Sequence, residues 1–309
     1  MSTETSNMTP DMQTYLDKVS AERGRRAAVQ TRYFLKELPS DLSPKSLDAL
    51  RTSLKASPLS PSSVNRKLNA IRAYLIWLSS TERANLSKRA IRDNLGFYRE
   101  RRKKVTLPPR HAVKKLLRLA IRRPGRHGMA YCSFMALGLF AGLRPGEIEA
   151  ANTTDIPEGK QYIHVKHTKT DIERHAYFRH STVLAIALPR LTEFDGPIVS
   201  SGAKDWFPLA AAEAGMGRVG RNVLRKLHAS YMAASGKFSE YDLMQHLGHT
   251  SATSIKFYRD PEVMDSIQPG DSIEEWMGVS DLNDALIDRI LGHDPRYTKP
   301  TYTASAKPA

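Results

Sequence analysis

Pro108 and Pro109 interrupt a chain whose hydrophobic pattern is otherwise largely helical. Proline lacks a backbone N–H and disfavours the helical conformation in the residue before it, so no helix continues through this point. The 309 residues are enough for two domains. We therefore place a domain boundary at about residue 106, between a helical domain at 9–105 and a second domain at 106–294. We expect residues 1–8 to be disordered and the Thr/Pro/Lys-rich residues 295–309 to form a flexible tail.

The excess positive charge is concentrated around this boundary. The chain holds 47 Lys and Arg against 32 Asp and Glu, a net charge of +15, and the stretch from Arg83 to Arg126 alone has 16 basic and two acidic residues. Such a stretch in a folded protein favours a polyanionic partner, and we expect nucleic acid rather than a merely solubilising surface or an anionic membrane. The stretch beside the boundary supplies candidate phosphate contacts: Arg101, Arg102, Lys103 and Lys104.

The clearest helix of the first domain begins at Ser60-Pro61, a capping serine followed by proline at the first helical position. Its apolar residues recur every three or four positions and form one core-facing stripe: Val64, Leu68, Ile71, Leu75 and Leu78. Arg66, Asn69 and Arg72 lie along another face. Arg and Asn can read base edges, so this face is a candidate DNA contact, with a solvated polar face as the alternative.

The second domain combines helices with one hairpin. We expect helices near His111–Arg122 and His127–Phe140, then short strands at Gln161–Thr168 and Glu173–Phe178 joined by the turn at Lys169–Ile172. The rest of the chain has mainly helical patterns. The predicted fold class is therefore mainly α with a small β-hairpin, an α+β domain behind a helical one.

Several classes of protein are excluded. No window approaches about 18 uninterrupted apolar residues, so a membrane span is not expected, and the polar N-terminus has no signal-peptide core. A single cysteine, Cys132, excludes an internal disulfide and a Cys-based zinc site and fits a reducing cytoplasm. The Walker A, GxGxxG, HExxH and GxSxG motifs are missing, as are acidic clusters with nuclease spacing. We expect neither a metal nor a cofactor.

The second domain carries polar residues in a distinctive order. GLFAGLRPGEIEAA, HVKHTKTDIERHAYF, NVLRKLHASYMAASG and LMQHLGHTSATSIKFY supply, in turn, Arg144 with Glu147, Lys169, Arg225, and His249 followed nine residues later by Tyr258. This order resembles that of the tyrosine recombinase/integrase family: Arg, Lys on a β-hairpin, HxxR, LGH, then Tyr. The resemblance covers about residues 107–260 strongly. It extends weakly to the first domain through SPSSVNRKLNAIRAYLIWL, which is similar to the family's core-binding domain.

The resemblance implies a two-domain clamp around double-stranded DNA and a site-specific recombinase that cleaves and rejoins it through a 3′-phosphotyrosyl intermediate. Tyr258 is then the nucleophile, and Lys169 protonates the leaving 5′-oxygen. Arg144 and Arg225 stabilise the charge that builds on the phosphate, His249 adds a hydrogen bond, and Glu147 orients an arginine. The family also implies a homotetramer on its DNA sites, in the cytoplasm and associated with the nucleoid.

One position departs from the family pattern. Where the HxxR motif has histidine, this chain has Asn222, which can donate a hydrogen bond but cannot exchange a proton near neutral pH. His228, one turn after Arg225, is a possible substitute, although a packing or surface role is the more common one for such a histidine. Two alternatives stay open: a catalytically impaired DNA-binding regulator of the same fold, and a DNA-relaxing enzyme of the type IB topoisomerase kind.

The C-terminal part predicts an assembly element. Ser280 precedes an amphipathic helix at about 281–291, with Leu282, Leu286 and Ile290 on one side and acidic residues beside them. In the family a C-terminal segment often docks on the neighbouring protomer. We expect this acidic helix to do so, with packing on its own domain as the alternative.

Overall fold

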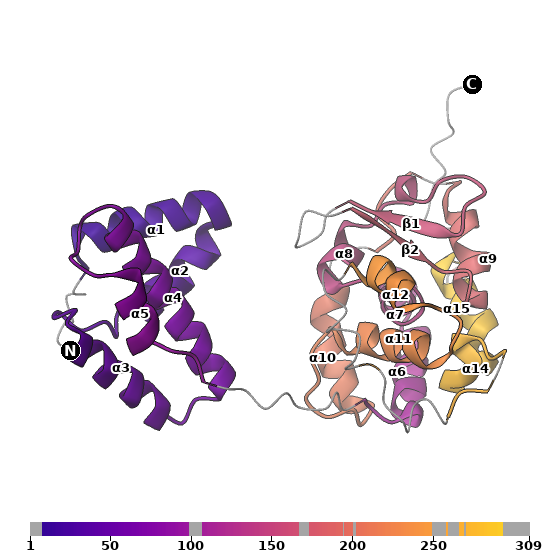
Figure 1. The fold of residues 1–309 in the computed structure, drawn as a ribbon. Coiled ribbons are helices and arrows are strands. Elements are labelled where there is room, and N and C mark those ends of the chain that lie inside the picture. Colours follow the sequence, from indigo (N-terminus) through magenta and orange to yellow (C-terminus); the bar gives the residue numbers. More distant parts are fainter. Residues whose placement is uncertain are drawn as a thin grey trace. The chain divides into compact units, whose positions relative to one another are not determined.

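The chain folds into two compact units, residues Met1–Lys103 and Lys104–Ala309 (Figure 1). The computed structural model describes residues 8–98, 107–166, 173–193, 195–199, 202–248, 258, 266–268 and 270–292. Each unit has its own hydrophobic core. The division lies next to the boundary expected at about residue 106. The predicted disordered N-terminus, apart from Met8, and the predicted tail lie outside the described residues.

The N-terminal unit is helical throughout residues 8–98. Its helices are α1 (Pro10–Arg23), α2 (Arg25–Leu35), α3 (Pro44–Ala56), α4 (Pro61–Ser80) and α5 (Lys88–Asn94). Ser43, Ser60 and Ser87 cap three of them by accepting a hydrogen bond from a first-turn N–H. The predicted helix after Ser60 is confirmed as α4. Its whole apolar stripe is buried, at 4% exposure or less.

The C-terminal unit is built around α7 (Gly125–Phe140), whose residues from 132 to 140 are all buried. Four helices that contact α7 are α6 (Arg110–Arg122), α10 (Ala203–Glu213), α11 (Val223–Ala234) and α15 (Asn283–Ile290). The other described elements are α8 (Pro145–Ala150), η1 (Thr153–Asp155), α9 (Thr182–Leu191), α12 (Glu240–Leu247), α14 (Ile273–Met277) and η3 (Ser280–Leu282). The predicted helices near 111–122 and 127–140 are confirmed by α6 and α7.

A two-stranded hairpin lies at one end of the C-terminal unit (Figure 1). Strands β1 (Tyr162–Val165) and β2 (Arg174–Tyr177) pair antiparallel, with Ile163 opposite Ala176 and Val165 opposite Arg174. β2 packs against α12. The predicted fold class, mainly α with one small hairpin, is confirmed, and the predicted turn at 169–172 lies outside the described residues.

The predicted docking helix, α15, packs against other helices of its own unit. Leu286 and Ile290 of α15 are buried at 0% and 2% exposure, and α15 packs on α7 and α9. Asp281 pairs with Lys114 of α6 at 2.7 Å, and the Arg289 Nε donates to the Ile121 carbonyl at 2.7 Å. In this chain the helix therefore packs on its own domain, the alternative to docking on a neighbouring protomer. Its apolar stripe is covered by α7 and α9, and Asp281, just before it, is paired with cations of α6.

Truncation after Gly278 should consequently destabilise the C-terminal unit. It removes Leu286, Ile287 and Ile290, whose burial is worth roughly 5 kcal/mol together. We expect a clearly lower midpoint in urea or thermal unfolding. Truncation after Gly292 is the matched control, because it keeps α15, and should leave the midpoint near that of the full chain. Equal midpoints for the two truncations would contradict the packing role of α15.

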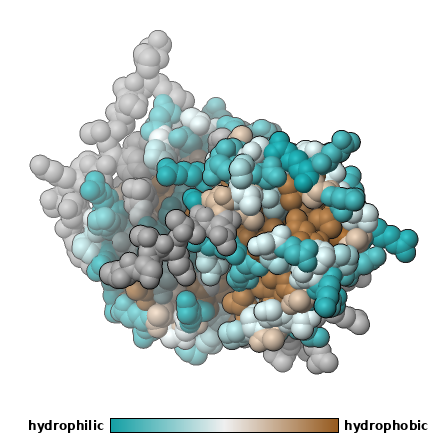
Figure 2. Space-filling view, turned by 90° about the vertical axis from the view of Figure 1, so that its left-hand side faces the viewer, coloured by the Kyte–Doolittle hydropathy of each residue, from teal (hydrophilic) through white to brown (hydrophobic). Residues whose placement is uncertain are grey.

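The surface in Figure 2 is hydrophilic over much of its area, with an apolar area among the hydrophilic residues. Exposed large apolar side chains of the N-terminal unit include Val29 and Tyr33, one turn apart on α2 and each 61% exposed. Within the described ranges, no helix has the length and apolar character needed to cross a bilayer.

Candidate active site

The buried carboxylate of Glu147 binds guanidinium groups from three different elements. Its Oε1 accepts from Arg144 Nη1 at 2.7 Å, and its Oε2 accepts from Arg174 Nη2 at 2.6 Å. Arg225 Nη1 lies 3.9 Å from the same Oε2. The side chains of Glu147 and Arg174 are 3% and 2% exposed, while that of Arg144 is 26% exposed. The carboxylate therefore orders three cations, of which Arg144 is the most accessible.

The local sequence places Arg144 and Glu147 side by side. Gly142 has φ +66°, which lets the chain turn sharply after α7, and Arg144 is the N-cap residue of α8. Pro145 is the first helical residue, and Glu147 at the third position accepts the Arg144 backbone N–H at 2.8 Å. A capping glutamate satisfies a helix N-terminus in this way. The same carboxylate thus caps a helix and orients the guanidinium of the capped residue.

Backbone carbonyls complete the orientation of the guanidinium groups. Arg225 Nη1 donates to the Gly142 carbonyl at 2.5 Å, and its Nη2 donates to the Leu247 carbonyl. Arg174 Nη1 donates to the His246 carbonyl. Carbonyls at a helix C-terminus have no partner inside the helix, so α12 offers them naturally to cations.

Gly248 ends α12 in the left-handed conformation, with φ +58°. A Cβ atom at this position would lie 2.7 Å from Arg174 Cδ, so any side chain here would clash with that of Arg174. The two constraints together require glycine. This residue directly precedes His249 of the LGH motif, which lies outside the described residues.

The cluster carries an excess of positive charge. Burial opposes ionisation of Glu147, but Arg174 and then the hydrogen bonds from Arg144 outweigh it and lower the pKa of the carboxyl. Burial, together with Arg174 and Arg144, lowers the pKa of Arg225 to about 9, which leaves it cationic at neutral pH. Among the described residues, three guanidinium groups thus surround one carboxylate. Such a site favours an anion.

An open groove of about 620 Å³ runs along Arg144. It is lined by Arg144, Pro145, Gly146, Glu147, Pro208, Val219, Gly220, Arg221 and Asn222. Asn222 is exposed and directly precedes α11, the helix that carries Arg225. The volume of the groove exceeds that of a phosphate group, and Asn222 and Arg144 both line it.

Tyr258 belongs to the same region. Its side chain is half-buried against the core of the C-terminal unit, and its charge state influences the pKa of Arg225. The structure therefore brings Arg144, Glu147 and Arg225 into one cluster, and Tyr258 is near enough to Arg225 to act on it electrostatically. Lys169 and the DNA-contact candidates Arg101, Arg102, Lys103 and Lys104 lie outside the described residues, as does His249.

Arg174 is the member of the cluster that the sequence analysis missed. β2 alternates, with Arg174 and Ala176 buried and His175 and Tyr177 exposed. An arginine on the inward face of a two-stranded hairpin needs a buried anionic partner. The inward position of Arg174 in the alternating pattern of the strand was the signal from which a buried anionic partner could be expected, and Glu147 is that partner.

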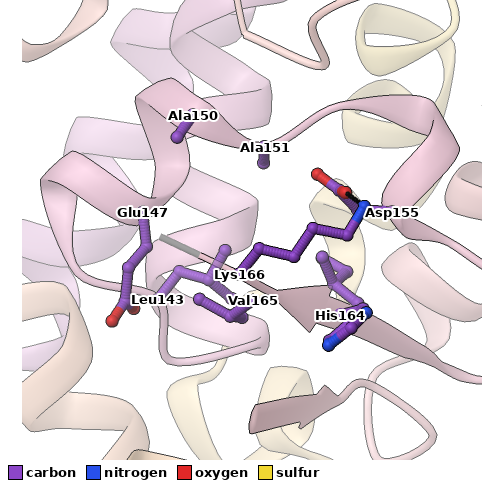
Figure 3. A pocket seen from close by; sticks show the side chains of 9 residues that line it. Leu143, Glu147, Ala150, Ala151, Asp155, His164, Val165 and Lys166 are labelled. Carbon is purple, nitrogen blue, oxygen red and sulfur yellow. Dashed lines mark hydrogen bonds and ion pairs between the residues drawn. The ribbon is translucent and has the colours of Figure 1, made fainter. Parts of the chain in front are cut away.

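Lys166 is a second lysine of the hairpin, and it is engaged elsewhere (Figure 3). Its Nζ donates to Asp155 Oδ1 at 2.7 Å, a bond that raises the pKa of this lysine. The adjacent pocket between α8 and β1 has a volume of about 10 Å³, room for about one water. The Glu147 carboxylate points away from Lys166 (Figure 3). This pocket therefore accommodates no ligand of substrate size.

The candidate DNA-reading residues of α4 differ in their surroundings. Arg66 and Asn69 are exposed, whereas the Arg72 guanidinium lies 4.3 Å from the ring centroid of Phe97. The first two are open to a ligand, and the third is held by a cation–π contact.

No group of three or more His, Cys, Asp or Glu side chains within the described part of the chain could hold a metal ion.

Comparisons with known proteins identify the fold. No protein-family model matches the sequence, and no curated protein does. A structure of lambda integrase bound to DNA superposes with a TM-score of 0.57 at 18% identity, covering 83% of this chain and 99% of that one. The Tn1549 transposon integrase in complex with circular intermediate DNA gives 0.54 at 15% identity, covering 81% and 95%. A lambda integrase tetramer bound to a Holliday junction gives 0.55 at 16%, covering 84% and 78%.

Proposed function

We propose that this chain, which has the fold of the tyrosine recombinases, is a site-specific DNA recombinase. The observation that carries the proposal is the cluster of Arg144, Arg174 and Arg225 around Glu147, next to Tyr258 and open to a groove. A phosphodiester is an anion that gains charge in the transition state of cleavage. Preorganised guanidinium groups stabilise that charge more than they stabilise the ground state.

In the proposed reaction Tyr258 gives its hydroxyl proton to His249, its oxygen attacks the scissile phosphorus, and the bond from phosphorus to the 5′-oxygen breaks. The product is a 3′-phosphotyrosyl bond and a free 5′-hydroxyl, which takes its proton from Lys169. Attack by a 5′-hydroxyl of the partner strand reverses the step and restores Tyr258. Lys166 is paired with Asp155, which supports Lys169 as the hairpin's general acid. Arg144 and Arg225 would bind the non-bridging oxygens, with His249 donating a further hydrogen bond.

The partner is double-stranded DNA with a specific recombination site. The proposed contacts of the N-terminal unit are Arg66, Asn69 and Arg72 on α4, and those of the basic stretch are Arg101, Arg102, Lys103 and Lys104. Lambda integrase forms a tetramer on a Holliday junction, and we expect this chain to assemble as a homotetramer on two sites in the cytoplasm, associated with the nucleoid. Because the apolar face of α15 is buried within its own unit, we propose that another surface joins the protomers.

The proposal is tested with DNA that the protein selects itself. Sites recovered from a random duplex pool are rebuilt as nicked suicide substrates, from which the short downstream fragment that carries the free 5′-hydroxyl diffuses away. We expect a covalent complex that withstands SDS. Specific binding without any covalent complex would favour the impaired regulator, and relaxation of supercoiled plasmids lacking the site would favour the topoisomerase-like enzyme.

Asn222→His should preserve or raise the rate of cleavage. Asn222 is exposed in the groove beside Arg144, and we propose that it hydrogen-bonds the scissile phosphate while Lys169 and His249 handle protons. Histidine also donates a hydrogen bond there. The rate of covalent-complex formation measures the effect, with Asn222→Ala as the variant without a donor. A severe loss in Asn222→His would mean that the groove requires the asparagine amide.

A further inference from the structure

Two buried histidines from different helices meet ring to ring beneath the arginine cluster. His228 of α11 and His246 of α12 are 0% and 2% exposed, and their Nε2 atoms lie 2.8 Å apart. A contact of this length between two ring nitrogens requires one of them to carry a proton and the other to accept it. The pair is therefore a hydrogen bond that joins the two helices.

The outer nitrogens determine which ring donates. His228 Nδ1 lies 2.9 Å from the Leu139 carbonyl, which only accepts, so this nitrogen carries a proton. His246 Nδ1 receives the backbone N–H of Tyr177 at 3.2 Å, so this nitrogen has none. In neutral rings the shared proton then belongs to His246 Nε2 and His228 Nε2 accepts it. All four nitrogens are satisfied with two protons.

The pair supports the carbonyl groups that orient two arginines. A Cβ on Gly142 would lie 2.4 Å from His228 Cδ2, so the ring packs directly on Gly142, whose carbonyl accepts from Arg225. The His246 carbonyl accepts from Arg174, and the next carbonyl, that of Leu247, accepts from Arg225. A shift of either ring would thus displace an acceptor of Arg174 or Arg225.

A third proton has no place in this arrangement. On His228 Nε2 it would face the N–H of His246, and on His246 Nδ1 it would face the N–H of Tyr177. Burial lowers the pKa of both rings well below the usual range, and His180, Arg174 and Arg225 lower it further. His180 packs against both rings, at 5.0 and 6.1 Å between centroids, and burial lowers its own pKa to about 4.

We propose that His228 and His246 are a positioning pair for the cleavage reaction, whose single shared proton holds the backbone acceptors of Arg174 and Arg225 in place. This role rests on the proposed function, because its effect is on cleavage. The hydrogen bonds of the pair connect α11 with α12 and, through the Tyr177 N–H, with β2. This arrangement also makes cleavage sensitive to acid, since a third proton would give the neutral pair a positive charge and separate the rings.

The pair itself is tested on the wild-type chain by NMR with ¹⁵N-labelled histidine. At neutral pH we expect one Nδ1–H ring and one Nε2–H ring, assigned through His228→Gln, and a scalar coupling between the two Nε2 atoms across the hydrogen bond. An imidazolium in the pair, or two rings without that coupling, would overturn the assignment. This readout does not depend on whether the protein cleaves DNA.

The positioning role is tested with two variants of one residue. His228→Gln offers an amide oxygen to the His246 N–H, whereas His228→Leu leaves that donor buried without a partner. We expect cleavage within about 3-fold of wild type for glutamine and lower by at least ~10-fold for leucine, with DNA binding unchanged in both. His175→Leu, at an exposed position of β2, is the control for the hairpin.

In the wild type, cleavage should fall on acidification at pH values where DNA binding and the folded signal persist. Cleavage by His228→Leu at the wild-type rate would overturn the positioning role, as would an acid loss of cleavage that only follows unfolding. If the wild type forms no covalent complex at all, the proposed function fails instead, and the NMR result still decides whether the pair exists.

Discussion

Arg144→Ala and Arg225→Ala should each lower the rate of DNA cleavage by at least ~100-fold, the scale of losing one transition-state donor. Arg144 is the accessible cation of the cluster, and Arg225 is held by two carbonyls and by the charge of Glu147. DNA binding should fall far less, because the basic stretch from Arg83 to Arg126 supplies many other phosphate contacts. Single-turnover cleavage and binding by fluorescence anisotropy, measured on the same substrate, separate the two effects.

Arg221→Ala is the matched control for this prediction. Arg221 lines the same groove, but its guanidinium donates to the Lys204 carbonyl at 2.7 Å and to Asp205 at 3.1 Å. Its removal takes away a groove cation without touching the Glu147 cluster, so cleavage should stay within a few-fold of wild type. Equal losses of binding and cleavage in the Arg144 and Arg225 variants would contradict the account. It assigns stabilisation of the transition state to these two arginines and most of the DNA affinity to the basic stretch.

Glu147→Gln should destabilise the C-terminal unit by about 3–5 kcal/mol, the usual cost of removing one partner from a buried ion pair. The amide keeps the shape of the side chain but leaves Arg144, Arg174 and Arg225 without their shared anion. Urea unfolding measures the loss. Bound DNA should restore part of it, because a phosphate supplies negative charge to the same cations.

Glu149→Gln provides the comparison on the same helix. Glu149 is exposed and pairs with Lys204 at 2.8 Å, an arrangement worth at most about 1 kcal/mol. If Glu147→Gln were as stable as Glu149→Gln, the carboxylate would not be the organiser of the cluster. The lowered pKa of Glu147 means that its contribution is present above its usual pKa and is lost as the pH falls below that value.

The parts of the fold that follow from local rules were predictable from the sequence. The stripe from Val64 to Leu78 predicts both the helix and its buried face, and Pro108-Pro109 lie a few residues after the division between the two units. The hairpin follows from two short strand patterns around a turn. The order of Arg144, Arg225 and Tyr258 indicated one shared site before any geometry was known, because a resemblance to a family fixes positions along a chain.

Partner choice was the part that the sequence could not decide. An amphipathic pattern identifies an apolar face but not the surface that covers it, so the sequence left open whether the stripe of Leu286 and Ile290 packs on a second protomer or on its own domain. The same uncertainty affects the basic stretch. Lys114 and Arg118 pair with Asp281 within the chain, so part of the positive charge attributed to DNA binding has an internal partner.

Arg174 and the pair of His228 and His246 escaped the sequence analysis for a related reason. Each depends on contacts between residues far apart in the chain: Arg174 with Glu147, and the rings of α11 and α12 with each other. No local pattern encodes such a contact. The ring of His228 is fully buried and is hydrogen-bonded to Leu139 and His246, so of the packing and surface roles expected for it the structure shows packing.

The most direct test of the central claim is to find the atom that carries the DNA. The covalent complex from a suicide substrate is digested with trypsin and nuclease, and the modified peptide is sequenced by mass spectrometry. We predict that a nucleotide is attached through its 3′-phosphate to Tyr258. Tyr258→Phe should form no covalent complex, but it should still bind DNA because only one hydroxyl is lost. Tyr241→Phe, at a residue that is 68% exposed, should behave as wild type. An adduct on any other residue, or one that persists in Tyr258→Phe, would contradict the account.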